Sequence, residues 1–128
     1  MRRALLVVVA LACGCGGEAE APGDPVGEAP WASVHDRPCP EGSVLTWENF
    51  GGPFLRNWCT GCHSADLAGS ARYDAPPGTD FDTPASARAW RERIWIRAAD
   101  GNATMPPAGG PDMEERRRLG EWLACGAP

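Results

Sequence analysis

The sequence predicts a small all-α protein in which three or more short helices are joined by long loops. Two segments carry apolar residues at helical spacing, and no convincing strand pattern is found near the middle of the chain. The intervening segments are rich in Gly, Pro and Asp, which is typical of loops. The residues at helical spacing are Ala87, Trp90, Ile94 and Ala98 in one segment and Leu119, Trp122 and Leu123 in the other.

A first helix is expected at about Gly52 to Cys62. Pro53 suits the first turn of a helix, because a backbone N–H at that position has no partner within the helix. The run Gly51-Gly52-Pro53 is expected to break any continuous helix with the preceding residues 45–50. The apolar side of this helix carries Phe54, Leu55 and Trp58.

The middle helix is expected to begin with Thr83 as its N-cap and Pro84 at its first position. The segment Asp100-Gly101-Asn102 would end it. Before this helix, residues 64–82 are expected to form an irregular loop. A loop of that length in a small domain is usually functional, and here it would wrap a bound group.

The last helix is expected over about Met113 to Ala124. Asp112 and Glu115 have the spacing of a capping box, and Gly126 follows as a C-terminal stop. The charged residues 114–118 are expected to form a solvated face of this helix.

The chemistry is concentrated at Cys59-Thr60-Gly61-Cys62-His63. Two cysteines separated by two residues and followed at once by a histidine form the attachment pattern of a c-type haem. Each thiol can add to one vinyl group of the porphyrin, and the spacing lets both sulfurs reach neighbouring edges of the ring. His63 would then lie over the iron as an axial ligand. We therefore expect one covalently bound haem c on Cys59, Cys62 and His63.

Two other interpretations of the cysteine pair are weaker. A thioredoxin-like dithiol is expected at a strand-to-helix junction, and no strand pattern stands near Cys59. A structural zinc site needs a second pair of ligands, and none follows with the required spacing.

The second axial ligand is expected to be Met105, in the Pro- and Gly-rich segment 103–110. A methionine in such a loop is unusual as a core residue, and neighbouring prolines restrict the backbone so that the thioether is aimed at a fixed point. Met113 in the last helix and His35 near the N-terminus are the rival candidates. An arginine of the middle helix would be placed to meet a haem propionate.

The N-terminus predicts export. Arg2 and Arg3 precede an apolar run over residues 4–12 that is too short to span a bilayer, which is typical of a secretory signal peptide. A small residue stands before Cys13, as in a bacterial lipobox. Cys13 is therefore the expected lipid acceptor, with Cys15 as the alternative and simple cleavage without lipid as the third outcome.

The chain is expected to divide into three parts. Residues 1–15 form the signal peptide, residues 16–36 an acidic tether with little to bury, and residues 37–128 the globular domain. A domain of about 90 residues makes only a modest core, so a covalent haem would supply apolar surface to pack around.

The cysteine count predicts one disulfide. The chain has six cysteines, of which two belong to the haem motif and two, Cys13 and Cys15, to the signal region. Cys39 and Cys125 remain, one at each end of the domain. Export permits disulfides, so we expect these two to pair, and the alternative is two free thiols.

These features together resemble the class I c-type cytochrome family over residues 39–128. The order is that of the family: a first helix running into Cys-x-x-Cys-His, a loop, a middle helix, a methionine in a Pro-containing loop and a last helix. In the family, a glycine of the first helix lets an aromatic residue of the last helix cross closely, and Gly51 and Trp122 fit these positions. A proline carbonyl orients the proximal histidine, and Pro76 is near the expected place.

The resemblance implies the small cytochrome c fold, wrapped around one haem, and an electron carrier rather than an enzyme. The Cys39-Pro40 opening and the ending at residues 122–126 look like those of small exported bacterial lipoprotein cytochromes. With His63 and Met105 on the iron, no position remains for a substrate. The alternatives are a haem-based gas sensor or haem enzyme subunit, more distantly a thiol-disulfide oxidoreductase, and a structural lipoprotein that carries the motif by chance.

The expected partners are unidentified redox proteins, with no nucleic acid and with membrane contact only through an N-terminal lipid. The expected location is the periplasm of a bacterium, either free or anchored to a membrane. From Arg37 to Pro128 the chain has no lysine and carries 10 Arg against 12 Asp and Glu, a net charge of −2. Docking is therefore expected through an apolar rim of loops, such as Met105 to Gly110, rather than through charge steering.

Overall fold

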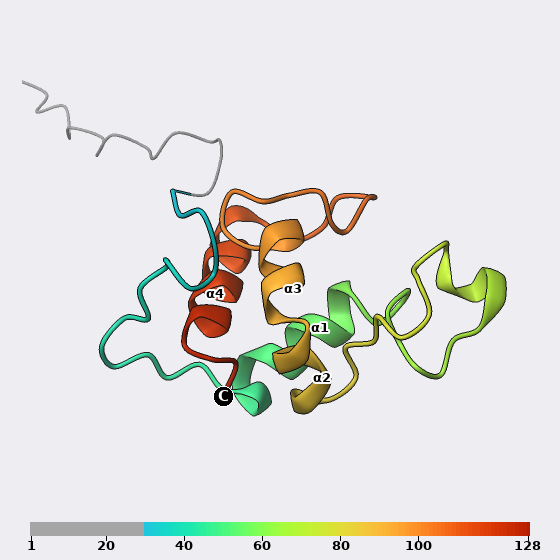
Figure 1. Ribbon diagram of the computed structural model, residues 1–128, viewed down its shortest axis with the longest axis horizontal. Coiled ribbons are helices and arrows are strands. Elements are labelled where there is room, and N and C mark those ends of the chain that lie inside the picture. Colours follow the sequence, from blue (N-terminus) through green and yellow to red (C-terminus); the bar gives the residue numbers. More distant parts are fainter. Residues whose placement is uncertain (1–29) are drawn as a thin grey trace, which may run out of the picture.

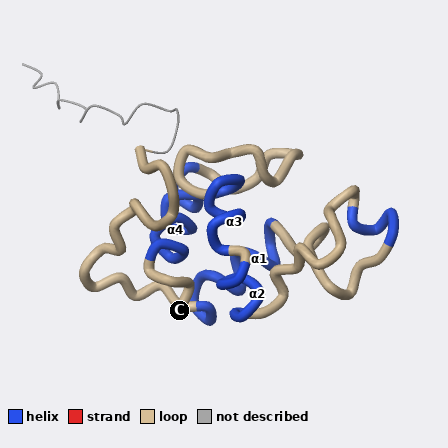
Figure 2. Tube along the Cα trace, viewed as in Figure 1, coloured by secondary structure: helices blue, strands red, loops and turns tan. Residues whose placement is uncertain are grey.

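The computed structural model describes residues 30–128, and every regular element among them is helical (Figures 1 and 2). The predicted all-α class is confirmed. The signal peptide, Cys13, Cys15 and residues 16–29 of the tether lie outside the described residues. In chain order the elements are η1 (Trp47–Gly51), α1 (Gly52–Trp58), η2 (Gly69–Arg72), α2 (Pro84–Ala89), α3 (Arg91–Ala98) and α4 (Met113–Ala124).

The first helical stretch begins earlier than expected. The run Gly51-Gly52-Pro53 does not break it, because the π-helical turn η1 continues directly into α1 and both glycines keep helical backbone angles. Thr46 and Asn49 form a capping box at its start, each side chain accepting a hydrogen bond from the other residue's backbone N–H. Pro53 falls in the first turn of α1, directly after η1.

Close packing, rather than a chain turn, explains why glycine stands at positions 51 and 52. A Cβ on Gly51 would overlap the indole of Trp122, and a Cβ on Gly52 would meet Trp47 at 3.0 Å. Trp122 is fully buried, and its ring centroid lies 6.3 Å from that of Trp47 and 6.5 Å from that of Phe50. The first helical stretch therefore crosses α4 at close range, as expected for Gly51 and Trp122.

The middle helix is interrupted where one continuous helix was expected. Thr83 caps α2 and Pro84 begins it, as predicted, but α2 ends at Ala89 and α3 begins at Arg91. Trp90 lies between them with φ −98° and ψ 5°, which is outside the helical region. The interruption lets α3 run alongside α4, against which it packs (Figure 1).

The last helix, α4, has the predicted bounds, and Asp112 and Glu115 form its capping box. Gly126 follows with φ +95°, and the N–H groups of Gly126 and Ala127 donate to the carbonyls of Leu123 and Trp122. This pair of bonds is a Schellman motif, in which the left-handed position favours glycine.

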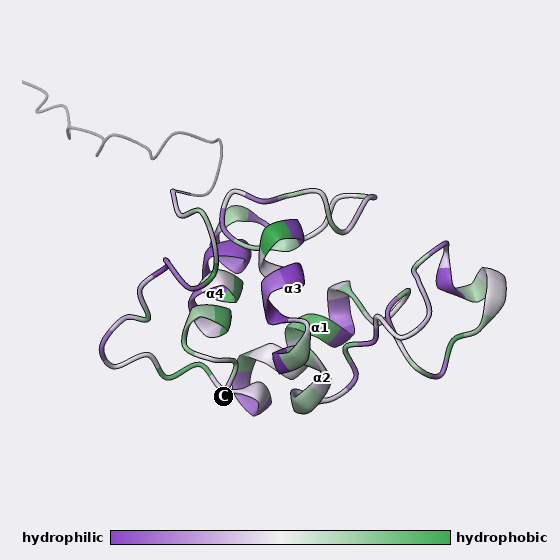
Figure 3. Ribbon diagram, in the orientation of Figure 1, coloured by the Kyte–Doolittle hydropathy of each residue, from purple (hydrophilic) through white to green (hydrophobic). Residues whose placement is uncertain are grey.

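The core lies where η1, α1, α3 and α4 meet, and Figure 3 shows hydrophobic segments on α1 and α4 at this junction. Burial of this apolar surface is the main stabilising contribution in so small a domain. The largest side chains that are fully buried are Trp122, Leu55, Leu119, Leu123 and Val34.

The packed domain begins before residue 37, where the boundary with the tether was expected. Val34 is only 1% exposed, and the ring of Trp31 lies over the guanidinium of Arg37. Arg37 in turn binds the carboxylate of Asp100 through Nε at 2.8 and 3.1 Å. Two apolar side chains in an acidic Gly- and Pro-rich stretch were too weak a pattern to predict this packing.

Cys39 and Cys125 are paired at disulfide distance, with their Cα atoms 4.8 Å apart and a sequence separation of 86. This is the pair that the cysteine count predicted. The backbone N–H of Trp47 also donates to the carbonyl of Pro128 at 2.6 Å. The segment before η1 is thus tied to the chain end that follows α4.

Candidate functional site

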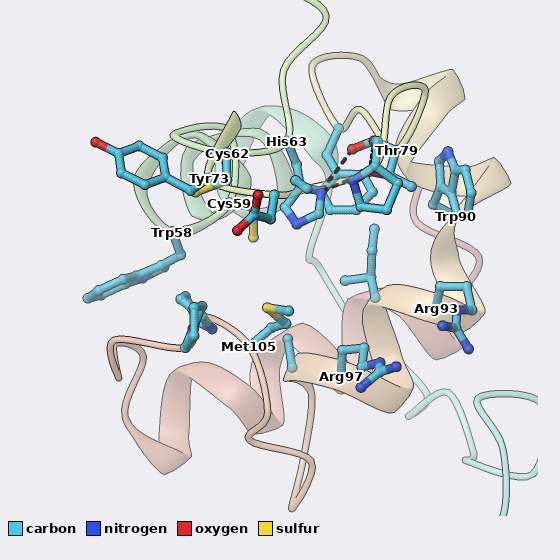
Figure 4. Close-up of a pocket in the computed structure, with 18 residues that line it drawn as sticks. Trp58, Cys59, Cys62, His63, Tyr73, Thr79, Trp90, Arg93, Arg97 and Met105 are labelled. Atoms are coloured by element: carbon cyan, nitrogen blue, oxygen red, sulfur yellow. Dashed lines mark hydrogen bonds between the residues drawn. The ribbon is translucent and has the colours of Figure 1, made fainter. Parts of the chain in front are cut away.

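One cavity collects the residues that the sequence singled out. It has a volume of about 450 Å³, has mostly apolar walls, and is lined by Cys59, Cys62, His63 and Met105 together (Figure 4). This volume is in the range of small-molecule and cofactor sites. The four residues come from two segments more than 40 residues apart in sequence, so the fold itself brings them to one place.

The motif forms a tight turn at the end of α1. The N–H of Cys59 donates to the carbonyl of Leu55, and the N–H groups of Cys62 and His63 both donate to the carbonyl of Cys59, at 3.1 and 2.9 Å. The helix therefore ends at Trp58, and its predicted extension to Cys62 was wrong. Both cysteines are half-buried and free of disulfide bonds.

The environment of Cys59 favours the protonated thiol. Burial, followed by the neighbouring Cys62, raises the pKa of Cys59 from 9.0 to about 12, while the positive charge of Arg116 opposes the shift. A reactive dithiol depends on the opposite environment, in which a nearby positive charge or a helix N-terminus lowers the pKa of one thiol. The environment of Cys59 is therefore not of the kind that activates a thiol for exchange.

His63 is fixed in one orientation. Its Nδ1 lies 2.8 Å from the carbonyl oxygen of Thr79, and its ring stacks on Phe81 with a centroid separation of 4.7 Å and an interplanar angle of 18°. A carbonyl oxygen can only accept, so Nδ1 carries the proton and donates it. In the neutral imidazole the lone pair is then on the other nitrogen, Nε2, which Figure 4 shows facing the cavity.

The proline expected to orient His63 does so only indirectly. The carbonyl that binds Nδ1 belongs to Thr79, whereas the carbonyl of Pro76 accepts a hydrogen bond from the Thr79 hydroxyl at 2.6 Å. Sequence distance placed Pro76 near the histidine, but the turn at residues 76–79 moves the contact three residues further along the chain. The assignment of the direct contact to Pro76 was therefore wrong.

A buried arginine organises the loop that supports His63. Arg72 is 5% exposed and donates to the carbonyls of Ser64, Ala75 and Pro76. It also forms an ion pair with Asp80 at 2.8 Å, although that carboxylate oxygen is in poor hydrogen-bond geometry. These contacts join both ends of the loop at residues 64–80 through one side chain.

Met105 lies on the side of the cavity opposite His63, and its thioether points toward the space between them (Figure 4). Its N–H donates to the carbonyl of Arg97 at 2.9 Å, and its own carbonyl accepts from Arg116 at 3.0 Å. Arg116 was expected on a solvated helix face but is only 5% exposed. That expectation was wrong because buried loop carbonyls, which the sequence does not reveal, are what bind its guanidinium.

The two ends of the cavity differ in character. Arg93 and Arg97, both from α3, lie at one end, and Trp58 and Tyr73 lie at the other (Figure 4). Tyr73 is 78% exposed and has a left-handed backbone with φ +48°. The cavity thus offers guanidinium groups at one end and aromatic surface at the other.

The rival ligand candidates lie outside the cavity. His35 contacts Arg91 and Glu92 on the outer face of α3, and Met113 is an exposed residue at the start of α4. Within residues 30–128, no group of three or more His, Cys, Asp or Glu side chains is arranged to hold a metal ion. His63 and Met105 are only two residues, and methionine is not among these four types, so the pair falls outside this kind of metal site.

Sequence analysis did not identify several residues that support the site. Thr79 and Phe81 contact the ring of His63, and Arg72 and Arg116 hold the two loops that border the cavity. Of these residues, only Arg72 could have been suspected from the sequence, because an arginine stands out within a loop rich in Gly, Pro and Asp.

Comparisons of the chain with protein-family models, with curated proteins and with solved structures give no match. In the part of the chain that the structure describes, no helix has the length and apolar character needed to cross a membrane.

Proposed function

We propose that this protein is a monohaem c-type cytochrome, similar to the class I family, that carries single electrons outside the bacterial cytoplasm. The observation that carries the proposal is the meeting of Cys59, Cys62, His63 and Met105 at one mostly apolar cavity. Two thiols, one imidazole and one thioether are the donor set that covalent attachment and six-coordinate iron require.

The chemistry of the residues present fits a haem. Cys59 and Cys62 are both free to form thioethers, and His63 directs Nε2 toward the cavity. The guanidinium groups of Arg93 and Arg97 at one end suit the two carboxylates of the macrocycle. A bound haem would supply one-electron chemistry at its iron.

The chain's own residues contribute binding, orientation and exclusion of water. The hydrogen bond from Nδ1 to the Thr79 carbonyl holds the imidazole in one tautomer and makes Nε2 a stronger donor to a metal. Stacking on Phe81 fixes the plane of the ring. A rigid pair of ligands, His63 and Met105, would keep the same geometry in both oxidation states, so that electron exchange requires little reorganisation.

A haem-based gas sensor or haem enzyme subunit requires a ligand that leaves the iron. The hydrogen bonds at both the N–H and the carbonyl of Met105 oppose that, because they fix the backbone from which the thioether extends. Carbon monoxide added to the reduced protein separates these functions. Slow or negligible binding is expected of the carrier, and rapid binding would favour the sensor.

Export is part of the proposal. The pairing of Cys39 with Cys125 fits an oxidising compartment, in which disulfides persist. We assign Cys13 as the lipid acceptor, and release of the mature protein from membranes after Cys13→Ala would test this.

Haem staining after denaturing electrophoresis tests the central claim, because only covalently bound haem remains with the chain. The full chain is expressed in a bacterium with the haem-attachment machinery, and the exported fraction is analysed. The unaltered protein should stain, and Cys59→Ser, Cys62→Ser and the double variant should lose most or all of the stain. An exported, folded protein without stain would contradict the proposal.

A further inference from the structure

We propose that Arg116 is a positioning residue, whose buried guanidinium holds the loop between α3 and α4 so that Met105 stays directed into the cavity. This inference rests on the proposed function, in which Met105 is an iron ligand. It assigns to a residue of the last helix, outside the cavity lining, the task of keeping that ligand in place.

Arg116 binds the whole length of the loop. Its Nη1 lies 2.8 Å from the carbonyl oxygen of Ala98, 3.0 Å from that of Met105 and 3.3 Å from that of Asn102. Its Nε donates to the carbonyl of Pro111 at 3.1 Å. These carbonyls belong to the last residue of α3, two residues within the loop and a residue just before α4, so one side chain joins the start, the interior and the end of the loop.

The burial of Arg116 makes these contacts energetically significant. The side chain has no carboxylate partner among the ion pairs formed within residues 30–128. A buried charge of this kind is tolerated only when hydrogen bonds replace its hydration. The carbonyl of Ala98 adds to this, because it lies at the C-terminal end of α3, where the helix dipole attracts a positive charge.

The neighbouring Arg117 shows the contrast. Its side chain is 58% exposed and pairs with Glu114 on the same helix surface. Such an exposed pair contributes little to stability. The two adjacent arginines therefore differ in environment while sharing helix, charge and size, which makes Arg117 the matched control.

Met105 depends on this clamp because little else holds it. Its side chain lines the cavity and is not part of the packed core, and the following Pro106 and Pro107 have no N–H to donate to the loop. The two backbone bonds, from its N–H to Arg97 and from Arg116 to its carbonyl, are what fix its position. Without Arg116, the carbonyl loses its partner and the thioether gains freedom to leave the iron.

The experiment compares Arg116→Gln, Arg116→Lys and Arg117→Gln with the unaltered holoprotein. Haem stain reports covalent attachment, and the weak charge-transfer band at the red edge of the oxidised spectrum reports thioether ligation. Arg116→Gln should keep its stain, lose most of the band and bind carbon monoxide at least about tenfold faster, the factor that corresponds to losing one charge-assisted hydrogen bond. Arg116→Lys should recover part of the band, and Arg117→Gln should match the unaltered protein.

The outcomes separate the two proposals. Absence of stain in the unaltered protein would overturn the cytochrome function, whereas an unchanged band and unchanged carbon monoxide binding in a stained Arg116→Gln would overturn the role of Arg116 alone. If Arg116→Gln does not accumulate, amide hydrogen exchange of the unaltered protein decides. The Met105 N–H should exchange slowly although it lies in a loop, and exchange as fast as that of an open loop would contradict the clamp.

Discussion

The indole of Trp122 lies against Gly51 so closely that a single added carbon at Gly51 would overlap the ring. Trp122 is fully buried and forms part of the core on which η1, α1 and α4 meet. The contact therefore sets the distance between the helix that leads into Cys59 and the helix that carries Arg116.

Gly51→Ala should destabilise the fold by about 1–3 kcal/mol, because the rigid indole cannot move aside and the helices must separate. Gly61→Ala is the control, since a Cβ there meets nothing within 4 Å. The free energy of unfolding from guanidinium titration of each protein measures the difference. Equal stabilities for the two variants would show that the helices do not cross as closely as the structure has them.

In the proposed cytochrome, Met105→Ala should abolish the red-edge charge-transfer band of the oxidised holoprotein and lower the reduction potential, because a thioether ligand is lost. Met113→Ala should change neither, since Met113 is exposed at the start of α4 and outside the cavity. Absorption spectra and redox titration of both variants provide the comparison. The reverse pattern would mean that Met113 is the ligand.

Arg72→Gln should destabilise the protein by about 3 kcal/mol, because Asp80 and the carbonyls of the loop lose their buried partner. The loop at residues 64–80 would open, and the orientation of His63 through Thr79 would be lost with it. Arg56→Gln, at an exposed position on α1, should change the stability by less than about 0.5 kcal/mol. Chemical unfolding measures both, and a neutral Arg72→Gln would rule out this account of the loop.

The Cys39–Cys125 pair closes a loop of 86 residues. In the chain-entropy model, a disulfide over this separation stabilises by about 4–5 kcal/mol, and by less where a covalent haem already restrains the unfolded chain. Reduction, or the double variant Cys39→Ser and Cys125→Ser, should lower the unfolding free energy accordingly. Thiol titration of the unfolded, unreduced protein is the direct check, and free reaction of both cysteines would disprove the bond.

Electron exchange with a partner should depend only weakly on ionic strength. Arg37, Arg72 and Arg116 are engaged inside the domain, so they are not available for a charged docking surface. Docking is instead expected at the apolar rim near Met105 to Gly110. A soluble form cut before Gly16 and its physiological partner would be mixed at rising salt, and a rate that falls severalfold across the screening range would contradict this.

The fold class and the last helix could be predicted because their patterns are local. The capping box of Asp112 and Glu115 and the apolar spacing within α4 involve residues a few positions apart. The bounds of the other helices were less accurate. Gly51 and Gly52 were expected to break a helix, whereas the structure uses them for close contact with Trp122 and Trp47. Whether a glycine serves a turn or a contact depends on residues distant in sequence.

Only some of the residues around the cavity could be predicted, because only some of them belong to a local sequence pattern. The spacing of Cys59, Cys62 and His63 carries its chemistry within five residues, so it is recognisable in any context. The groups that support these residues are backbone carbonyls, such as that of Thr79, and every residue has one. Only the folded chain determines which carbonyl lies beside His63 and which ones surround the guanidinium of Arg116.

The guanidinium of Arg116 also carries a positive charge close to the cavity. Its positive charge acts on Cys59, where it opposes the larger effects of burial and of Cys62 that raise the pKa of the thiol. A positive charge that favours a thiolate over a thiol also favours any state of the site that holds one more negative charge. In the proposed cytochrome, the electron that reduces the iron would be such a charge. The residue that holds the loop would therefore also bias the site toward its reduced form, and a protein that kept the loop but lost the charge would give up electrons more readily.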